Sequence, residues 1–124
     1  MIEFSDNKPI YRQIVDYASN LIIDGTWIPG ERVPSVRELA AELGVNTRTV
    51  LKAMEDLQAA EMIVSKRGMG FLLAADAPEK VMEERRRDFF ATTLPSLVAE
   101  MKRLALSPDD VISSLKKDFP QNGT

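Results

Sequence analysis

The chain of 124 residues contains no cysteine and no histidine. The missing cysteines exclude disulfide bonds, thiolate metal sites and cysteine nucleophiles, and the missing histidines exclude imidazole bases and imidazole metal ligands. No stretch approaches the roughly 20 apolar residues of a membrane-spanning helix, and no basic region followed by an apolar one opens the chain as in a secretion signal. The sequence also lacks a Gly-rich phosphate loop and a metal-ligand cluster. We therefore expect no enzyme, no cofactor, no metal, no membrane association and a cytoplasmic location.

The composition and the charge set the next limits. Apolar residues make up 44% of the chain, which is enough for a packed core. The formal net charge is −3, and residues 31–75 carry six basic and six acidic side chains. A surface that binds phosphate must therefore come from sorting basic groups onto one face. The length suits one domain, or one small domain with an attached element.

Two helices are expected in the first 45 residues. Apolar residues recur at helical spacing between Pro9 and Asp24, and Gly25 ends that segment. Residues 35–38 have the sequence of a capping box, in which the Ser35 hydroxyl and the Glu38 carboxylate each satisfy a backbone N–H group. A short helix should begin there and end at the next glycine. Ser35 is better explained as this cap than as a phosphate ligand, although one residue can serve both roles.

A third helix and a hairpin follow. Asn46 can cap a helix that runs to about Ala60, and the turn before it is short and contains Gly44, which predicts a helix-turn-helix. Residues 63–65 and 71–73 are expected to form two strands around a tip at 66–70. Lys66 and Arg67 make this tip basic, and its two glycines permit close backbone approach. We favour contact with DNA over an ordinary solubilising tip.

The third helix carries the candidate reading face. At 100° per residue its apolar residues share one side, and Arg48 and Lys52 lie one turn apart on the other side. Basic groups near the start of such a helix can contact bases in the major groove, and Arg48 could bind guanine with two hydrogen bonds. Thr47 and Thr49 could bond phosphate or a base edge, whereas Asn46 is expected to act as a cap. A single exposed arginine usually does no more than solvate a surface, but the order helix, turn, helix and basic hairpin favours the binding interpretation.

The remainder of the chain is expected to be helical. A helical pattern extends from about Glu79 to Ala105, interrupted at Pro95, and Ser107 begins a last short helix. One stripe of this pattern is apolar: Phe89, Phe90, Leu94, Leu97, Val98, Met101 and Leu104. The stripe could fold back onto the first domain or pack on a second copy, and we favour the second copy because two short helices bury too little of it. The charged cluster at 83–88 is expected to be a solvated face.

Three groups of residues resemble the GntR family of bacterial regulators. They are Pro9-Ile10-Tyr11-Arg12-Gln13-Ile14, then Pro29-Gly30-Glu31-Arg32-Val33-Pro34-Ser35-Val36-Arg37-Glu38-Leu39-Ala40, and Leu43-Gly44-Val45-Asn46 with Thr49-Val50. The resemblance covers about residues 8–74, and the short two-helix tail is similar to that of the YtrA subfamily. It implies a dimeric winged-helix protein, usually a repressor.

The resemblance also implies roles for individual residues. Arg37 and either Arg48 or the preceding Thr47 would contact bases. Phosphates would be held by Arg32, Ser35 and Thr49, and the wing around Gly68 and Gly70 would enter the minor groove. Two positions depart from the family pattern: the family often has Arg or Pro in place of Thr47, and Glu61 stands where a glycine is usual.

The sequence thus predicts a mostly α fold with a small β wing. Residues 1–75 would form a winged helix-turn-helix DNA-binding domain, and residues 76–124 a helical dimerisation region. The expected function is a regulator, usually a repressor, that binds a two-fold symmetric double-stranded DNA operator as a homodimer. The alternative is a winged-helix module for protein–protein assembly without specific DNA binding. A small-molecule effector remains open, because a dimer interface can form a pocket.

Overall fold

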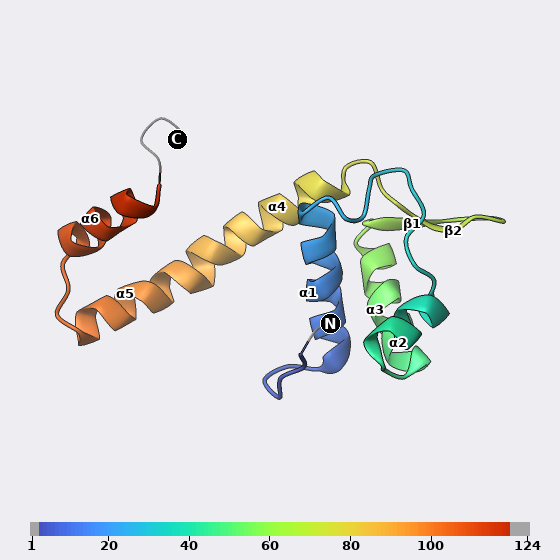
Figure 1. Cartoon of the computed structure of the whole chain (residues 1–124), viewed down its shortest axis with the longest axis horizontal. Coiled ribbons are helices and arrows are strands. Elements are labelled where there is room, and N and C mark those ends of the chain that lie inside the picture. Colours follow the sequence, from blue (N-terminus) through green and yellow to red (C-terminus); the bar gives the residue numbers. More distant parts are fainter. Residues whose placement is uncertain (1–2, 120–124) are drawn as a thin grey trace. The chain divides into compact units, whose positions relative to one another are not determined.

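The computed structural model describes residues 3–119 and divides the chain into two compact units, Met1–Glu84 and Arg85–Thr124. The first unit contains α1 (Ile10–Ile23), α2 (Val36–Leu43), α3 (Thr47–Ala59), β1 (Ile63–Lys66), β2 (Gly70–Leu73) and the start of α4 (Ala77–Asp88) (Figure 1). The second unit contains the end of α4, a π-helical turn η1 (Phe89–Thr93), α5 (Leu94–Arg103) and α6 (Pro108–Asp118).

Local backbone chemistry sets the ends of α2 and α3. Ser35 and Glu38 form the expected capping box, with the Ser35 Oγ accepting from the Glu38 N–H at 3.1 Å. Gly44 ends α2 in the left-handed conformation with φ 67°, which favours glycine because it has no Cβ. The Oδ1 atom of Asn46 then accepts a hydrogen bond from the Arg48 N–H at 2.8 Å. The two helices therefore follow each other across a tight turn, as the helix-turn-helix prediction required.

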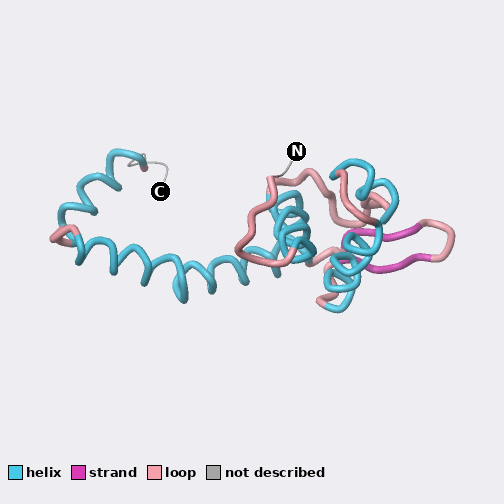
Figure 2. Tube along the Cα trace, turned by 90° about the horizontal axis from the view of Figure 1, so that it is seen from below, coloured by secondary structure: helices cyan, strands magenta, loops and turns pink. Residues whose placement is uncertain are grey.

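The wing is a hairpin of two strands (Figure 2). The strands are antiparallel, and Ile63 pairs with Leu73 and Lys66 with Gly70. The segment before α2 extends this sheet, because Arg32 forms a bridge with Leu72 and the Val33 N–H donates to the Phe71 carbonyl at 2.9 Å. The hairpin is thus attached at its base to the loop that leads into α2.

The core of the first unit is apolar throughout. Its largest fully buried side chains come from α1, α2, α3, both strands and the loop before α2, and no polar or charged side chain is buried among the described residues. They are Ile14, Ile22, Leu39, Met54, Ile63, Leu73, Val33 and Val50. The apolar faces expected for α1, α2 and α3 are therefore the faces that pack together.

The first compact unit continues past the boundary at residue 75 that the sequence suggested. Helix α4 begins at Ala77, and both Ala77 and Val81 are buried in the core of the first unit. Two apolar residues four positions apart lie on one helical face, so the first turns of α4 complete this core. The unit therefore includes the start of α4 and extends to Glu84.

The second unit has helices but no core of its own. Pro95 cannot donate a backbone hydrogen bond, and the turn before it widens so that the Leu94 N–H donates to the Phe89 carbonyl, five residues back. The expected interruption at Pro95 therefore takes the form of a π-turn. Ser107 and Asp110 form a second capping box at the start of α6. None of residues 85–119 is buried.

Candidate nucleic-acid interface

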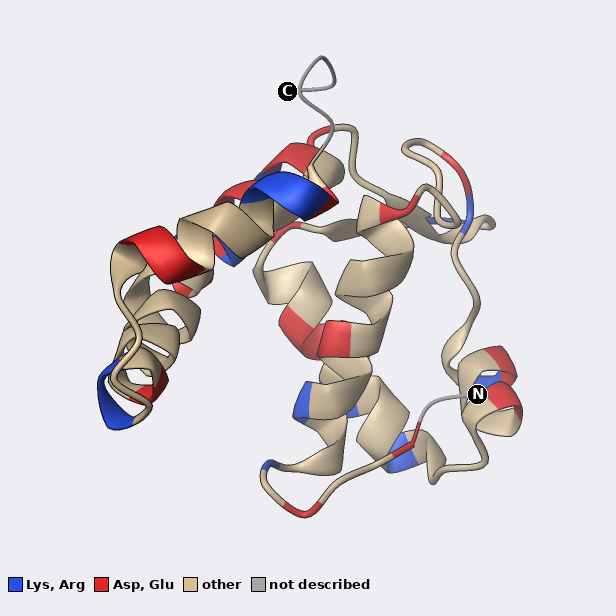
Figure 3. Cartoon of the chain, turned by 60° about the vertical axis from the view of Figure 1, so that its left-hand side comes forward, with Lys and Arg blue, Asp and Glu red and all other residues tan. Residues whose placement is uncertain are grey.

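Helix α3 presents the expected face to solvent. Val50, Met54 and Leu57 are buried, whereas Arg48 and Lys52 are exposed on the opposite side. Thr47 is exposed and Thr49 is half-buried at the edge of the core. The basic positions of the chain are marked on the ribbon in Figure 3. Within the described residues Arg48 takes part in no ion pair, so its guanidinium is available to a ligand.

Asn46 acts as the cap of α3, because its side-chain oxygen already holds the Arg48 N–H. This bond satisfies one of the free N–H groups at the helix start and fixes the backbone that carries Arg48. Asn46 therefore positions Arg48, and its oxygen is occupied within the protein.

Lys52 is not freely extended into solvent. Its Nζ atom lies 4.5 Å from the centre of the Tyr11 ring, which is within the range of a cation–π interaction. Tyr11 is half-buried on α1, next to the core. The side chain of Lys52 thus lies where α1 meets α3, and sequence periodicity alone does not show this contact between two separate helices.

The expected phosphate ligands around α2 are linked by one carboxylate. Glu38 accepts the Ser35 N–H at 2.9 Å and pairs with the Nη2 atom of Arg32 at 2.8 Å. The backbone and hydroxyl of Ser35, and then Arg32, hold the pKa of Glu38 below its ordinary value. Arg32 and Ser35 are therefore brought together and oriented by Glu38, whereas Arg37 is exposed in the first turn of α2 and forms no ion pair within the described residues.

The wing tip is exposed and turns sharply. Gly68 and Gly70 both have positive φ, at 80° and 78°, and Lys66 and Arg67 are exposed beside them. A Cβ atom added to Gly70 would meet the Nε atom of Arg32 at 3.6 Å, so the wing runs close to that guanidinium. Lys66 is the last residue of β1 and Gly70 the first of β2, so both lie at the strand ends rather than within the loop.

Two exposed apolar residues in this region are not among the DNA contacts that the sequence predicted. Met69 is 54% exposed at the wing tip, and Leu51 is 45% exposed on α3. The helical period could have predicted an exposed Leu51, because position 51 lies one turn after Thr47 and outside the buried face of α3.

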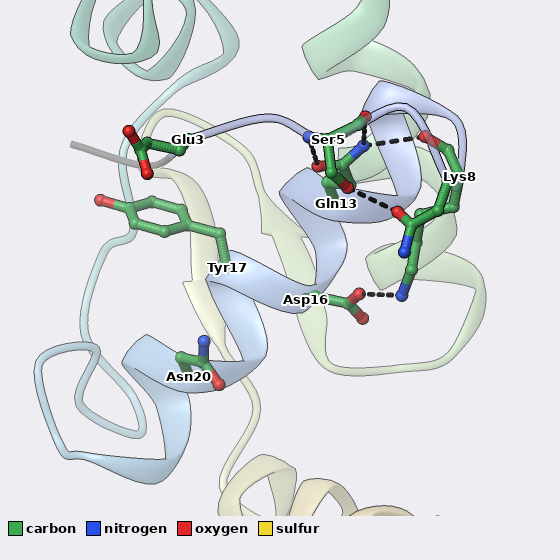
Figure 4. Close-up of a pocket in the computed structure, with 8 residues that line it drawn as sticks. Glu3, Ser5, Lys8, Gln13, Asp16, Tyr17 and Asn20 are labelled. Atoms are coloured by element: carbon green, nitrogen blue, oxygen red, sulfur yellow. Dashed lines mark hydrogen bonds and ion pairs between the residues drawn. The ribbon is translucent and has the colours of Figure 1, made fainter. Parts of the chain in front are cut away.

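A shallow hollow of about 280 Å³ lies between the N-terminal segment and α1 (Figure 4). Its polar groups already bond one another: Gln13 bonds the backbone of Ser5 and Lys8, and Lys8 pairs with Asp16 at 2.7 Å. Within residues 3–119 no group of three side chains could hold a metal ion. Over the same residues no helix has the length and apolar character that crossing a membrane requires.

Helices α2 and α3 with the attached hairpin define a winged helix-turn-helix protein, as the sequence predicted. The model of the gntR family of bacterial regulatory proteins matches residues 10–73, and the chain belongs to this family. It is therefore a transcriptional regulator with a winged-helix DNA-binding domain, and not an enzyme.

Three known proteins show the range of the similarity. The transcriptional repressor YtrA of Bacillus subtilis is 35% identical over 82 residues, which cover 66% of this chain and 63% of YtrA. A GntR-family regulator from Listeria monocytogenes has a solved structure that is 36% identical, with a TM-score of 0.73 over 92% of this chain and 98% of that one. The DNA-binding domain of AraR, solved with its operator ORR3, is 28% identical with a TM-score of 0.52, over 60% of this chain and 89% of that domain.

Proposed function

We propose that this regulator is a repressor that binds a two-fold symmetric DNA operator as a homodimer. The observation that carries the proposal is the exposed start of α3, where Arg48 projects from a capped helix in a unit that also carries a Gly-rich basic wing. A helix of this kind enters the major groove with its first residues against the base edges. Arg48 would bind guanine, and Thr47 would contact a neighbouring base edge or phosphate.

The remaining site residues would hold the DNA backbone. Arg37 lies in the first turn of α2 and would approach the same groove. Phosphate contacts would come from the α2 start, the edge of α3 and the wing, with the glycines letting the wing backbone enter the minor groove. These residues are Arg32, Ser35, Thr49, Lys52, Lys66, Arg67, Gly68 and Gly70. The AraR domain in complex with its operator supports DNA as the ligand, and the repressor YtrA supports the direction of regulation.

The second unit supports the homodimer. Phe89 and Phe90 pack edge to face with ring centres 5.2 Å apart, yet they are 46% and 66% exposed. Leu97, Val98 and Leu104 are exposed along the same stripe, and Leu94 and Met101 are half-buried. The helical segments η1, α5 and α6 contain no buried residue. Their apolar side chains form a surface that a second copy would cover.

In this proposal the first unit, which ends at Glu84, binds DNA, and the second unit, which starts at Arg85, forms the dimer. The regulator would act on the chromosome in the cytoplasm. A small molecule that changed how the two copies present their DNA-binding units would change operator affinity, because operator spacing follows dimer geometry.

Selection from a random pool of duplex DNA at physiological salt tests the proposal. Sequencing of the bound fraction should reveal two copies of one short site in inverted orientation, about one helical turn apart. A transcription template that carries this site across its promoter should then lose activity when the protein is added. Folded protein that enriches no site would contradict the proposal and favour a winged helix used for protein assembly.

A further inference from the structure

Leu51 is an apolar side chain on the face of α3 that carries the basic residues. It is 45% exposed, and it is absent from both the buried core and the half-buried residues that pack against this core. The other apolar residues at this level of the helix, Val50 and Met54, are fully buried. Leu51 therefore has no packing role in the chain that would explain a leucine.

The position of Leu51 places it among the expected DNA contacts. It lies one helical turn after Thr47 and three residues after Arg48, so both side chains are its neighbours on the helix surface. At 100° per residue it is rotated by about 40° from Thr47 and about 60° from Arg48. A helix that brings Arg48 to a base edge also brings Leu51 to the floor of the major groove.

The major groove offers one apolar group to such a side chain. Among the four bases only thymine carries a methyl group there, on C5, and apolar side chains recognise it by contact. We propose that Leu51 determines specificity by packing against the C5-methyl of a thymine beside the base pair that Arg48 contacts. This assignment rests on the proposed function, because it requires α3 in the major groove.

Duplex DNA is the partner that the surroundings of Leu51 favour. Arg48 and Lys52 flank it, the exposed carboxylate of Glu55 lies one turn further along α3, and the wing adds Lys66 and Arg67 on the same unit. An apolar side chain next to two cations at the start of the helix suits a polyanion that also carries methyl groups. A protein partner would be recognised instead by a wider apolar surface, and the exposed neighbours of Leu51 on α3 are polar.

The experiment removes the methyl group without changing the base pair. Each thymine of the selected operator is replaced in turn by uracil, and affinity is measured for the wild type and for Leu51→Ala. At one thymine in each half-site the wild type should bind uracil about fourfold more weakly, the factor that corresponds to roughly 0.8 kcal/mol for one buried methyl-sized group. Leu51→Ala should bind the thymine and uracil duplexes equally well.

The control is Ile28→Ala, which removes a side chain that is 47% exposed in the loop between α1 and α2. This variant should keep the wild-type sensitivity to uracil. Indifference of the wild type to every uracil, or an unchanged penalty in Leu51→Ala, would overturn the role of Leu51 and leave operator binding intact. Failure to select any operator would overturn the proposed function itself, and with it this assignment.

Discussion

The ammonium group of Lys52 lies 4.5 Å from the centre of the Tyr11 ring, so the exposed face of α3 is in contact with the first turn of α1. Tyr11 packs against the core while its ring holds a cation at the surface. Lys52 therefore has a preferred position before any ligand binds, which lowers the entropy that a phosphate contact would lose.

Lys52→Ala should weaken binding to all DNA sequences by a similar factor. A lysine that contacts phosphate carries no base information, so the preferred operator should stay the same. The slope of log affinity against log salt should fall in magnitude by about one unit. Titrations of specific and random duplexes at several salt concentrations check this, with Lys117→Ala on α6 as the control. A change in the preferred operator sequence would contradict it.

Arg48→Ala should lose specific affinity on the order of 1–3 kcal/mol and relax the preference at one base pair in each half-site. Binding to random duplex should change much less, because the phosphate contacts remain. Selection repeated with the variant shows which position has become degenerate. Arg86→Ala, in the charged stretch of α4, should select the wild-type operator, and an unchanged preference in Arg48→Ala would remove Arg48 from the base-reading role.

The sequence predicted the helix ends of the winged helix-turn-helix well because the signals for them are local. A capping box, a left-handed glycine and an asparagine cap act within four residues, and Ser35, Gly44 and Asn46 all behave as their neighbours suggest. The apolar faces of the helices were equally readable, since each face recurs with the helical period.

Long-range contacts were not predictable in this way. The cation–π contact of Lys52 joins two helices, and the bridge of Arg32 to β2 joins a loop to the wing. Both depend on how separate elements pack, which no local pattern encodes. The extension of the first unit into α4 had the same origin, because Ala77 and Val81 meet a core formed by residues far away in sequence. The roles of the site residues in DNA binding stay predictions until they are measured.

Glu61→Gly should stabilise the first unit by roughly 1 kcal/mol, because Glu61 has φ 61°, a left-handed conformation that is strained for residues with a Cβ. It follows the C-cap of α3, and the Met62 N–H closes the turn onto the Leu57 carbonyl at 2.9 Å. Urea denaturation should show a higher midpoint for the variant. Glu61→Ala, which loses the long 3.9 Å contact with Lys80 but keeps the strain, should show no gain. Equal midpoints for all three proteins would exclude strain at this position.

The carboxylate of Glu38 should make the stability of the first unit sensitive to acid. Its pKa is lowered in the folded state by the backbone and hydroxyl of Ser35 and by Arg32, relative to an ordinary value of 4.5. The stabilisation is therefore complete above pH 4.5 and is lost as the pH falls through the lower folded-state pKa.

Glu38→Gln keeps a cap for the Ser35 N–H but cannot titrate, so its unfolding free energy should fall less than that of the wild type between pH 7 and about pH 3. Urea denaturation at both pH values measures the difference. Glu42→Gln, on the same helix, leaves the Ser35 and Arg32 contacts in place and should follow the wild type. A parallel decline of Glu38→Gln and the wild type would refute the prediction.

Leu97→Asp should convert the proposed dimer to a monomer. Leu97 is 43% exposed in the single chain, at the centre of the apolar stripe, and none of residues 85–119 is buried. A dimer through this stripe would bury two new carboxylates, at a cost of at least about 2 kcal/mol each. Sedimentation velocity should show half the wild-type mass, with unchanged fluorescence from Trp27, the single tryptophan, which is buried in the first unit. Ser96→Asp adds the same charge one residue away, outside the stripe, and should remain dimeric. A Leu97→Asp protein that still sediments as a dimer would place the interface elsewhere on the chain.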